Sequence, residues 1–313
     1  MKLIREIGNL KGVLVYPVVT LGNFDGVHLG HRHIFDQVIA RARQAEGESV
    51  VYTLDPHPMK VLKPGSNLPL ITSTSRKIEL IESCGIDVVI CDHFSEHFAE
   101  RSPEQFVRDI LVNGIRAREV LVGDDYRFGR GRSGDIKMLA DLGREFGFDV
   151  AAAEQVEIDG VPVRSTRIRE MVRRGDVDGA AKLLGRPYIL TGTVTRGAGR
   201  GKTIGFPTAN LETTDELIPA TGVYAGLVML GGNRFGGAIN LGTNPTFDGK
   251  TFSIEVYILD FSREIYGETM EIHFVSRLRD EMPFGSPDEL CRQIDHDVSR
   301  AREILHELLS PER

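Results

Sequence analysis

Ten residues near the N-terminus combine the side chains and turns that phosphate chemistry uses. Residues 22–31 read GNFDGVHLGH, with three glycines, two histidines and one aspartate. The glycines allow the backbone to approach a ligand closely. His28 and His31 can share one face of a first helical turn, where free N–H groups and the helix dipole favour phosphate. Imidazoles there can donate hydrogen bonds to phosphate oxygens as charge builds up during phosphoryl or nucleotidyl transfer.

Two other interpretations of this stretch stay open on the residues alone. One is a tight turn with two surface histidines. The other is a metal site, because His33 follows closely on His28 and His31. A spacing of three residues, with Asp25 as the nearby carboxylate, is a weak pattern for zinc. The residues therefore favour nucleotide chemistry over the metal site.

Two glycine-rich segments resemble nucleotide-binding fingerprints without satisfying them. Residues 129–134 (GRGRSG) fit G-x-G-x-x-G, and Glu154 follows at a distance that suits a ribose ligand. The preceding strand is expected to end near Val122, too early for a dinucleotide-binding turn. Residues 196–203 (RGAGRGKT) lack the first glycine of a Walker A motif, and Pro207 prevents a helix there. Each segment is either a basic phosphate-facing loop or a solvent-exposed loop.

Two further groups of residues have alternatives of their own. Ser165 and Thr166 open a basic helical stretch, where a hydroxyl can cap the helix or bind an anion together with Arg169. Residues 253–260 alternate with period two, which places Glu255 on the face opposite the aliphatic residues. That carboxylate either faces solvent, as is usual, or acts as a general base at a pocket.

The elements that position these groups alternate between strand and helix in the first half of the chain. Apolar strands alternating with amphipathic helices predict a doubly wound α/β domain with a parallel sheet. Ligands of such folds bind beyond the carboxyl ends of the strands, where residues 22–31, Asp55, His57 and Asp125 fall. The expected strands are 13–21, 49–54, 86–91, 119–122 and 148–156, and the expected helices are 32–44, 75–83, 103–112 and 135–146.

The pattern changes after about residue 165. A helix-like stretch leads to a Gly-Arg-Pro interruption, after which short strand patterns alternate with Gly and Pro clusters. This predicts a small antiparallel β-barrel closed by a C-terminal helix. We therefore expect two domains, residues 1–186 and residues 187–313. The expected helices are 167–184 and 287–309, and the expected barrel strands are 189–195, 222–229, 234–240, 253–261 and 268–275.

The composition is that of an ordinary globular protein, and its charge excludes some classes of binding partner. The chain has 313 residues, 41% of them hydrophobic, and a formal net charge of −7. The acidic balance argues against nucleic acid or an anionic membrane as partner, and no apolar run could span a bilayer. Cys84, Cys91 and Cys291 are scattered, so neither a zinc cage nor a disulfide framework is indicated. The N-terminus lacks the apolar core of a signal peptide, so we expect a cytoplasmic protein.

Taken in order, the motifs make the chain similar to a known family. It resembles the bifunctional bacterial riboflavin kinase/FAD synthetases along nearly its whole length. The first half contains GNFDGVHLGH, DPHP, GDDYRFGRGRSG and RSTRIRE; the second contains LLGRPY, GRGKTIGFPTANL, GVYAG, NLGTNPTF, SIEVYILDF, IYG, LRDEMPF and QIDHD. The resemblance implies an FMN adenylyltransferase domain of nucleotidyltransferase fold and a riboflavin kinase barrel. Riboflavin, FMN and ATP would be the small-molecule partners, with Mg²⁺ as the metal.

In the N-terminal domain the resemblance implies two sets of binding residues. The first set contacts ATP and contains the histidine signature, with catalytic His28 and His31, the phosphate-binding asparagine and a mobile Ser/Thr–Arg element: Gly22, Asn23, Phe24, His28, Gly30, His31, Ser165, Thr166 and Arg169. The second set lies near the nucleotide and the flavin: Asp55, His57 and Asp125.

In the C-terminal domain the resemblance implies a phosphate site, a base and a flavin site. Thr208 and Asn210 match the Pro-Thr-Ala-Asn motif and would hold Mg²⁺ as well as phosphate. Glu255 matches the catalytic base that takes the proton from the ribityl 5′-hydroxyl. The other ATP-binding residues would be Gly199, Gly201 and Lys202, and the flavin-binding residues would be Arg279 and Glu281.

Two positions depart from the family pattern and affect the details of the first flavin pocket. Arg164 stands where family members often have a small hydroxyl residue, and Tyr126 where they often have Phe. Two alternative functions are a nucleotidyltransferase with another acceptor, whose barrel only binds flavin, and a non-catalytic flavin-binding protein. The retained His28, His31 and Glu255 argue against both. The sequence does not determine the oligomeric state.

Overall fold

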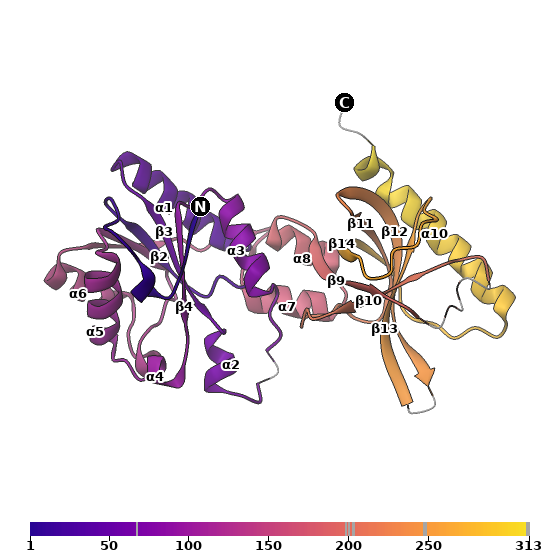
Figure 1. The fold of residues 1–313 in the computed structure, drawn as a ribbon, viewed down its shortest axis with the longest axis horizontal. Helices are drawn as coiled ribbons and strands as arrows, with labels where there is room; N and C mark the ends of the chain where they lie inside the picture. Colours follow the sequence, from indigo (N-terminus) through magenta and orange to yellow (C-terminus); the bar gives the residue numbers. More distant parts are fainter. Residues whose placement is uncertain (67, 198, 200, 202–203, 247–248, 311–313) are drawn as a thin grey trace. The chain divides into compact units, whose positions relative to one another are not determined.

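The chain, examined as a computed structural model, divides into two compact units, Met1–Ser165 and Thr166–Arg313. The structure describes residues 1–66, 68–197, 199, 201, 204–246 and 249–310 (Figure 1). In this described part of the chain, no helix combines the length and apolar character needed to cross a membrane.

The first unit is built on a parallel sheet, as the sequence predicts. Its six strands lie in the order β1-β4-β3-β2-β5-β6, and every neighbouring pair is parallel. The strands are β1 (Lys2–Arg5), β2 (Val18–Leu21), β3 (Ser49–Asp55), β4 (Val88–His93), β5 (Glu119–Gly123) and β6 (Asp149–Ala153).

Two features of this sheet differ from the sequence prediction. Strand β1 was not expected, and it pairs with β4 at the edge of the sheet. Residues 13–17 were expected to belong to the strand that became β2, but they lie outside it. Tyr16 has a φ of 40°, and Pro17 has no N–H for a sheet hydrogen bond. The extended pairing therefore begins only at Val18.

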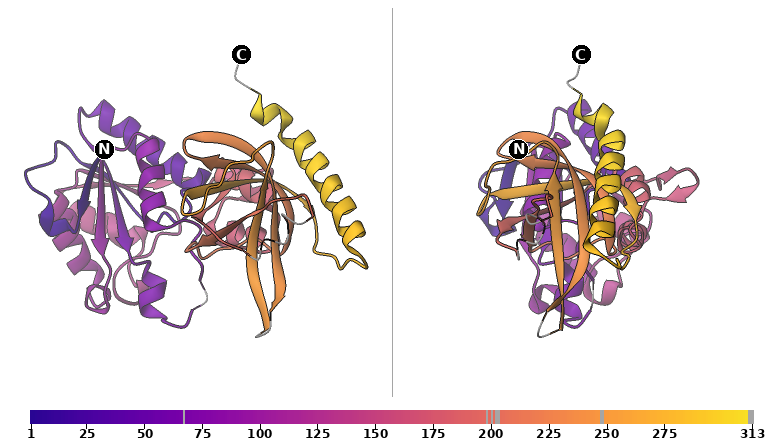
Figure 2. Two further views of the ribbon diagram at one scale, coloured as in Figure 1. Left: turned by 45° about the vertical axis from the view of Figure 1, so that its right-hand side comes forward. Right: turned by 90° about the vertical axis from the view of Figure 1, so that its right-hand side faces the viewer.

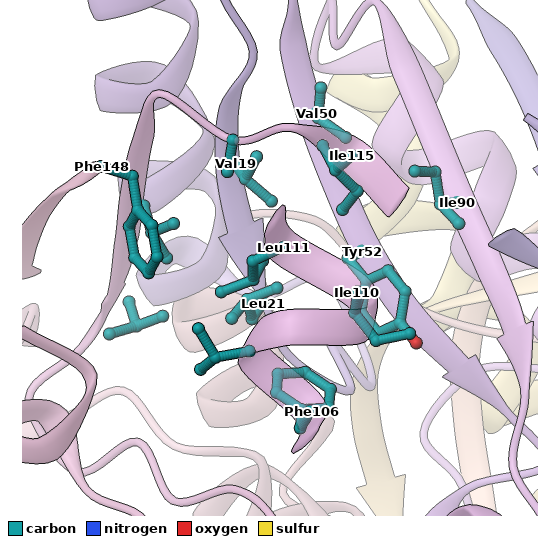
Figure 3. Packing of buried hydrophobic residues seen from close by; sticks show 14 of the residues in the cluster. Val19, Leu21, Val50, Tyr52, Ile90, Phe106, Ile110, Leu111, Ile115 and Phe148 are labelled. Carbon is teal, nitrogen blue, oxygen red and sulfur yellow. The ribbon is translucent and has the colours of Figure 1, made fainter. Parts of the chain in front are cut away.

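Neighbouring residues of each strand pack on opposite faces of the sheet, because side chains alternate along a strand. Val18 packs with Phe35 of α1 (Leu29–Gln44) and Ile81 of α3 (Thr74–Ser83). Val19 packs on the other face, among the residues of the cluster drawn in Figure 3. Both faces are thus covered by helices, which confirms the doubly wound arrangement (Figure 1).

The second face is covered by two helical segments. The expected helix over 103–112 is a short helix α5 (Pro103–Phe106) that continues as the π-helical turn η2 (Val107–Ile115). Helix α6 (Ile136–Phe146) packs beside it. The remaining elements of the unit are η1 (Ile7–Asn9), α2 (Pro58–Leu62), α4 (Glu96–Ala99), η3 (Arg130–Arg132), β7 (Glu157–Ile158) and β8 (Val161–Pro162).

The second unit is a closed antiparallel barrel, which confirms the predicted architecture. Helices α7 (Ser165–Arg173) and α8 (Val177–Leu184) precede it in the chain. The strand order in the described residues is β10-β13-β12-β11-β14-β9, and all neighbours are antiparallel. The strands are β9 (Tyr188–Thr195), β10 (Ala209–Thr213), β11 (Gly222–Leu230), β12 (Asn233–Thr246), β13 (Gly249–Ile258) and β14 (Thr269–Arg279).

Helix α10 (Pro287–Leu309) lies along the outside of the barrel (Figure 2). Its small residue Ala301 and its larger neighbour Leu305 are buried against strands β11 and β12. The partners on the strands are also small or aliphatic, so the helix can approach the barrel closely. They include Ala225, Leu227 and Ala238.

We predict that Leu139→Ala lowers the free energy of unfolding of the first unit by about 2–5 kcal/mol, because Leu139 is fully buried in the cluster beneath α6. Urea denaturation measures the change. Glu145→Ala, at an exposed position of the same helix, is the matched control and should change stability by less than about 0.5 kcal/mol. Equal effects of the two substitutions would contradict this packing.

Candidate active sites

The turn that follows β2 is held in place by a buried aspartate. The carboxylate of Asp25 is 4% exposed and accepts hydrogen bonds from the backbone N–H groups of Ile71 (3.0 and 3.1 Å) and Thr72 (3.2 Å). Its backbone carbonyl accepts a hydrogen bond from Ser165 Oγ at 3.0 Å. Three distant segments therefore meet at this turn, and the predicted residue Ser165 is one of them.

The two histidines of the turn form one stacked unit at the start of α1. His28 caps the helix, and its Nδ1 accepts a hydrogen bond from the backbone N–H of His31 at 3.3 Å. The two rings stack with centroids 3.5 Å apart, and Phe24 packs edge-on against His31. Because Nδ1 of a neutral His28 accepts this hydrogen bond, the ring proton of that neutral form is on Nε2.

Gly30 gives the first histidine its space. A Cβ atom at this position would lie 3.2 Å from His28 Nδ1 and 3.4 Å from the carbonyl oxygen of Val163. Any larger residue would have to displace the imidazole or the neighbouring backbone. A glycine at this position therefore leaves room for the His28 ring beside the first turn of α1.

Asp55 is the last residue of β3, and His57 follows the strand at the same edge of the sheet. Asp55 Oδ1 accepts a hydrogen bond from Thr74 Oγ1 at 2.6 Å. His57 caps the short helix α2, with Nδ1 accepting from the backbone N–H of Met59 at 3.2 Å. The side chains of both predicted residues are therefore used in hydrogen bonds that hold the chain near the end of β3.

A cavity of about 640 Å³ opens at this edge of the sheet. Among the predicted residues of the first unit, Gly22, Asn23 and Asp125 line it, whereas the two histidines, Asp55, His57 and Ser165 are not among its described lining residues. Aromatic side chains from several segments form much of the wall. They are Tyr52, Phe94, Phe98, Phe106, Tyr126 and Phe128.

These rings suit a flat, apolar ligand, because aromatic faces stack favourably. The rings of Tyr126 and Phe128 stack 5.7 Å apart, and Tyr52 donates a hydrogen bond to the buried carboxylate of Asp92 at 2.7 Å. Burial, followed by the charge of Asp92, raises the pKa of Tyr52, so its hydroxyl stays protonated. Apart from Tyr126, this aromatic wall was not predicted from the sequence, although Phe94 follows β4 and Phe128 follows β5.

The segment 129–134 also contributes to the cavity, with Arg130 and Arg132 at the wall. It is a closed loop, because Phe128 and Gly134 exchange two backbone hydrogen bonds of 3.1 and 2.9 Å. This geometry differs from a dinucleotide-binding turn, in which the glycines lead directly from a strand into a helix. The structure therefore contradicts the dinucleotide-binding interpretation and places the arginines of this loop at the cavity wall.

A second cavity, of about 480 Å³, lies at the barrel. It brings together all the predicted residues of the second unit except Lys202, which lies outside the described residues. The predicted residues among its lining are Gly199, Gly201, Thr208, Asn210, Glu255, Arg279 and Glu281.

Glu255 is at the centre of this polar set. It pairs in register with Asn210 on one neighbouring strand and with Asn240 on the other. One carboxylate oxygen lies 3.5 Å from Thr208 Oγ1, and the other lies 3.5 Å from Ser253 Oγ. The carboxylate therefore belongs to the cavity and not to the outer surface. Asn240 was not selected from the sequence, although it is the first residue of the NLGTNPTF motif.

The donor set around Glu255 fits a hard divalent cation. Hydroxyl, amide and carboxylate oxygens are the ligands that Mg²⁺ prefers, and Thr208, Asn210 and Glu255 supply one of each kind. The set includes one carboxylate, which leaves room for phosphate oxygens and water to complete the coordination. A divalent cation is therefore compatible with these residues.

The glycine-rich loop packs closely over the same residues. A Cβ atom on Gly197 would lie 2.0 Å from Asn210 Nδ2, and one on Gly201 would lie 2.3 Å from the carbonyl oxygen of Phe206 and 3.2 Å from Thr208 Oγ1. Glycine is thus required at both positions for the loop to reach the strand. This explains the glycines in a segment that is not a Walker A motif.

Arg279 is fixed by an acidic residue of α10. Its guanidinium donates three hydrogen bonds of 2.7–3.1 Å to the carboxylate of Asp297, which is 4% exposed. Gln293 donates to the same carboxylate at 2.9 Å. Glu281, the other predicted flavin residue, accepts from the backbone N–H of Thr243 at 3.1 Å. Asp297 was not selected from the sequence, although it ends the QIDHD motif.

Comparison with known proteins decides the family. The FAD synthetase family model matches residues 14–167 and the riboflavin kinase model matches residues 184–305. The chain is 37% identical over 307 residues to the bifunctional riboflavin kinase/FMN adenylyltransferase of Escherichia coli (strain K12), covering 97% of this chain and 98% of that one. This chain belongs to the bifunctional riboflavin kinase/FMN adenylyltransferase family.

Two other proteins are similar to this chain over nearly its whole length. The riboflavin kinase/FMN adenylyltransferase of Haemophilus influenzae is 38% identical over 308 residues, which cover 98% of this chain and 100% of that protein. A solved structure described as a macrolide-efflux protein from Streptococcus pneumoniae is 32% identical, with a TM-score of 0.88, and covers 96% of this chain and 99% of that one. The resemblance inferred from the motifs is thus confirmed.

Each half of this chain contains one of the two cavities. All lining residues of the aromatic cavity fall within 14–167, and all those of the barrel cavity fall within 184–305. The two family matches are therefore each associated with a separate site.

We predict that Asp297→Ala lowers the free energy of unfolding of the second unit by about 3 kcal/mol, because it leaves the Arg279 guanidinium, which is 20% exposed, without its carboxylate. Chemical denaturation followed by circular dichroism measures the loss. Asp295→Ala, at an exposed position of the same helix, is the control and should be nearly neutral. A loss of the same size in both variants would show that the ion pair is not the cause.

Proposed function

We propose that this chain catalyses both reactions of its family. The second unit would phosphorylate riboflavin with ATP to give FMN, and the first would adenylylate FMN with ATP to give FAD and pyrophosphate. The observation that supports this most strongly is the pairing of one cavity with each family match. The aromatic cavity suits an isoalloxazine ring, and the barrel cavity holds a base beside oxygen ligands.

In the first unit, we propose that the flavin occupies the aromatic cavity, with Asp125 at its wall, and that ATP binds at the histidine turn. Asn23 connects the two, because it lines the cavity and belongs to that turn. The flavin-binding set would also include Asp55 and His57 near the nucleotide. The triphosphate would be held by Gly22, Asn23, Phe24, His28, Gly30, His31, Ser165, Thr166 and Arg169.

Adenylyl transfer then needs no protein nucleophile. An oxygen of the FMN phosphate attacks the α-phosphorus of ATP, and the bond to the bridging oxygen breaks to release pyrophosphate. The protein must align the reactants and stabilise the negative charge that spreads over the phosphate oxygens. The imidazoles of His28 and His31 would supply hydrogen bonds, and the positive end of the α1 dipole would stabilise the charge.

In the second unit, we propose that Glu255 is the general base. It would take the proton of the ribityl 5′-hydroxyl as that oxygen attacks the γ-phosphorus of ATP, and ADP would leave. Thr208 and Asn210 would hold Mg²⁺, which when bound neutralises charge on the phosphate oxygens. Gly199, Gly201 and Lys202 would enclose the phosphates. Arg279 and Glu281 would contact the flavin.

We also propose residues 1–186 and 187–313 as the two catalytic domains. The family matches support this, because the first ends at residue 167 and the second begins at residue 184. Helices α7 and α8 lie almost entirely in the second compact unit, which begins at Thr166. In this proposal they would belong to the first catalytic domain. A cytoplasmic location stays a prediction from the sequence.

We predict that His28→Ala abolishes FAD formation and leaves FMN formation intact, because the imidazole donor serves only the first site. Purified protein is incubated with riboflavin, ATP and Mg²⁺, and the flavins are separated by chromatography. The wild type should give FMN first and then FAD. If the wild type stops at FMN, the first unit serves another acceptor; if the variant loses both products while folded, the assignment of sites is wrong.

We predict that Glu255→Gln lowers the rate of FMN formation by about 10²–10⁴-fold, the usual contribution of a general base, while FAD formation from added FMN is unchanged. The same chromatographic assay, started from riboflavin or from FMN, separates the two rates. Glu212→Gln, at an exposed position of β10, is the matched control. Normal phosphorylation of riboflavin by the Glu255 variant would exclude this carboxylate as the base.

A further inference from the structure

One lysine of the first unit lies where lysines are rarely found. Lys77 is on the buried face of α3, among Ile78, Leu80 and Ile81, and is 6% exposed. Buried lysines are uncommon because removing an ammonium from water is costly unless it is fully hydrogen-bonded. The surroundings of Lys77 must therefore supply that compensation.

Three oxygen atoms surround the ammonium of Lys77. Nζ donates to the backbone carbonyl of Asn23 at 3.2 Å, to Thr53 Oγ1 at 3.0 Å and to the backbone carbonyl of Leu54 at 3.3 Å. Thr53 Oγ1 itself lies 3.3 Å from the same Asn23 carbonyl, to which it donates its own hydrogen. The threonine oxygen is then an acceptor for Lys77, and the four groups form one consistent network.

Three acceptors match the three hydrogens of the charged form. A neutral amine has two hydrogens and could donate to only two of these acceptors. Burial lowers the pKa of Lys77, while Cys91, Asp55 and Asp25 act in the opposite direction. The three acceptors thus offset part of the cost of burying this amino group.

The same segment of chain also holds the ends of the strands on either side. The backbone N–H groups of residues 71 and 72 donate to the carboxylate of Asp25, in the turn after β2. The hydroxyl of Thr74 donates to Asp55, at the end of β3. Lys77 adds a direct connection between these two strand ends, because Asn23 follows β2 and Leu54 belongs to β3. Lys77 therefore contacts the backbone of the turn that contains Asn23 and leads to the two histidines.

We propose that Lys77 is a positioning residue for adenylyl transfer. It fixes the Asn23 carbonyl against the end of β3, and in this way sets the direction of the Asn23 side chain and of the turn that leads to His28. Lys77 touches neither substrate in this proposal. The inference rests on the proposed function, because it assumes that this turn binds ATP.

The test compares Lys77→Met, which keeps the length of the side chain and removes its donors, with Lys77→Arg, Thr53→Val and Thr53→Ser. Lys137→Met, at an exposed position of α6, is the control. Steady-state kinetics of FAD formation give kcat and the KM for ATP for each variant. Riboflavin kinase activity of the same chains measures intact protein, and urea unfolding gives the folded fraction of the first unit.

We expect Lys77→Met to raise the KM for ATP and to lower kcat/KM for FAD formation about tenfold or more, since small misplacements of binding groups have effects of this size. Kinase activity should be unchanged, and Lys77→Arg should restore part of the loss. Thr53→Val, which is the milder change if the methionine variant does not fold, should raise the KM for ATP more than Thr53→Ser does. In the double variant Lys77→Met/Thr53→Val, kcat/KM for FAD formation should be little lower than in Lys77→Met alone. The two substitutions should not be additive because both side chains act through one network.

A different pattern would overturn the inference. If FAD formation falls only in proportion to the folded fraction, with the KM for ATP unchanged in both the Lys77 and the Thr53 variants, the network is merely structural. If the wild type forms no FAD at all, the proposed function fails and the inference fails with it. A wild type that forms FAD beside an equally active Lys77→Met overturns the inference alone.

Discussion

The burial of both faces of the parallel sheet is the constraint on which the first unit depends. Because the residues of the central strands face one helical layer or the other, polar side chains have few places on those strands. They gather instead where the strands end, as Asp25 and Asp55 do, and each is met there by donors from the segment before and within α3. The same requirement that builds the core therefore concentrates charge and hydrogen-bond donors at one edge.

In the barrel, polar side chains can lie on the strands themselves. Its strands are antiparallel and closed, so one face of each strand points inward and polar groups can lie on neighbouring strands in direct register. Asn210, Glu255 and Asn240 occupy three adjacent strands in this way. The first unit assembles its polar groups from loops, whereas the second assembles them from a rigid ladder and covers them with glycines that leave no room for a Cβ atom.

What the sequence could predict follows from these differences. The central strands and the barrel strands other than β10 were predictable because their apolar patterns are local. The polar barrel set came from the motifs that the chain shares with a known family. Strand β1 was missed because a single one of its four residues is buried and its partner β4 is more than eighty residues away. The aromatic cavity was missed because the sheet order alone brings Tyr52, Phe98 and Phe128 together. Lys77 was hidden because an apolar helical face predicts burial but not which polar groups it can satisfy.

The strand order also sets the sequence in which the chain can complete its parts during synthesis. The edge strand β1 must wait for β4, yet the whole sheet is present once residue 153 has been made. The barrel closes only when β14, which ends at residue 279, pairs with β9 near the start of the second unit. Domains generally fold in order from the N-terminus as they emerge from the ribosome. The nascent chain therefore has a complete nucleotidyltransferase sheet while its kinase half still has two unpaired edges.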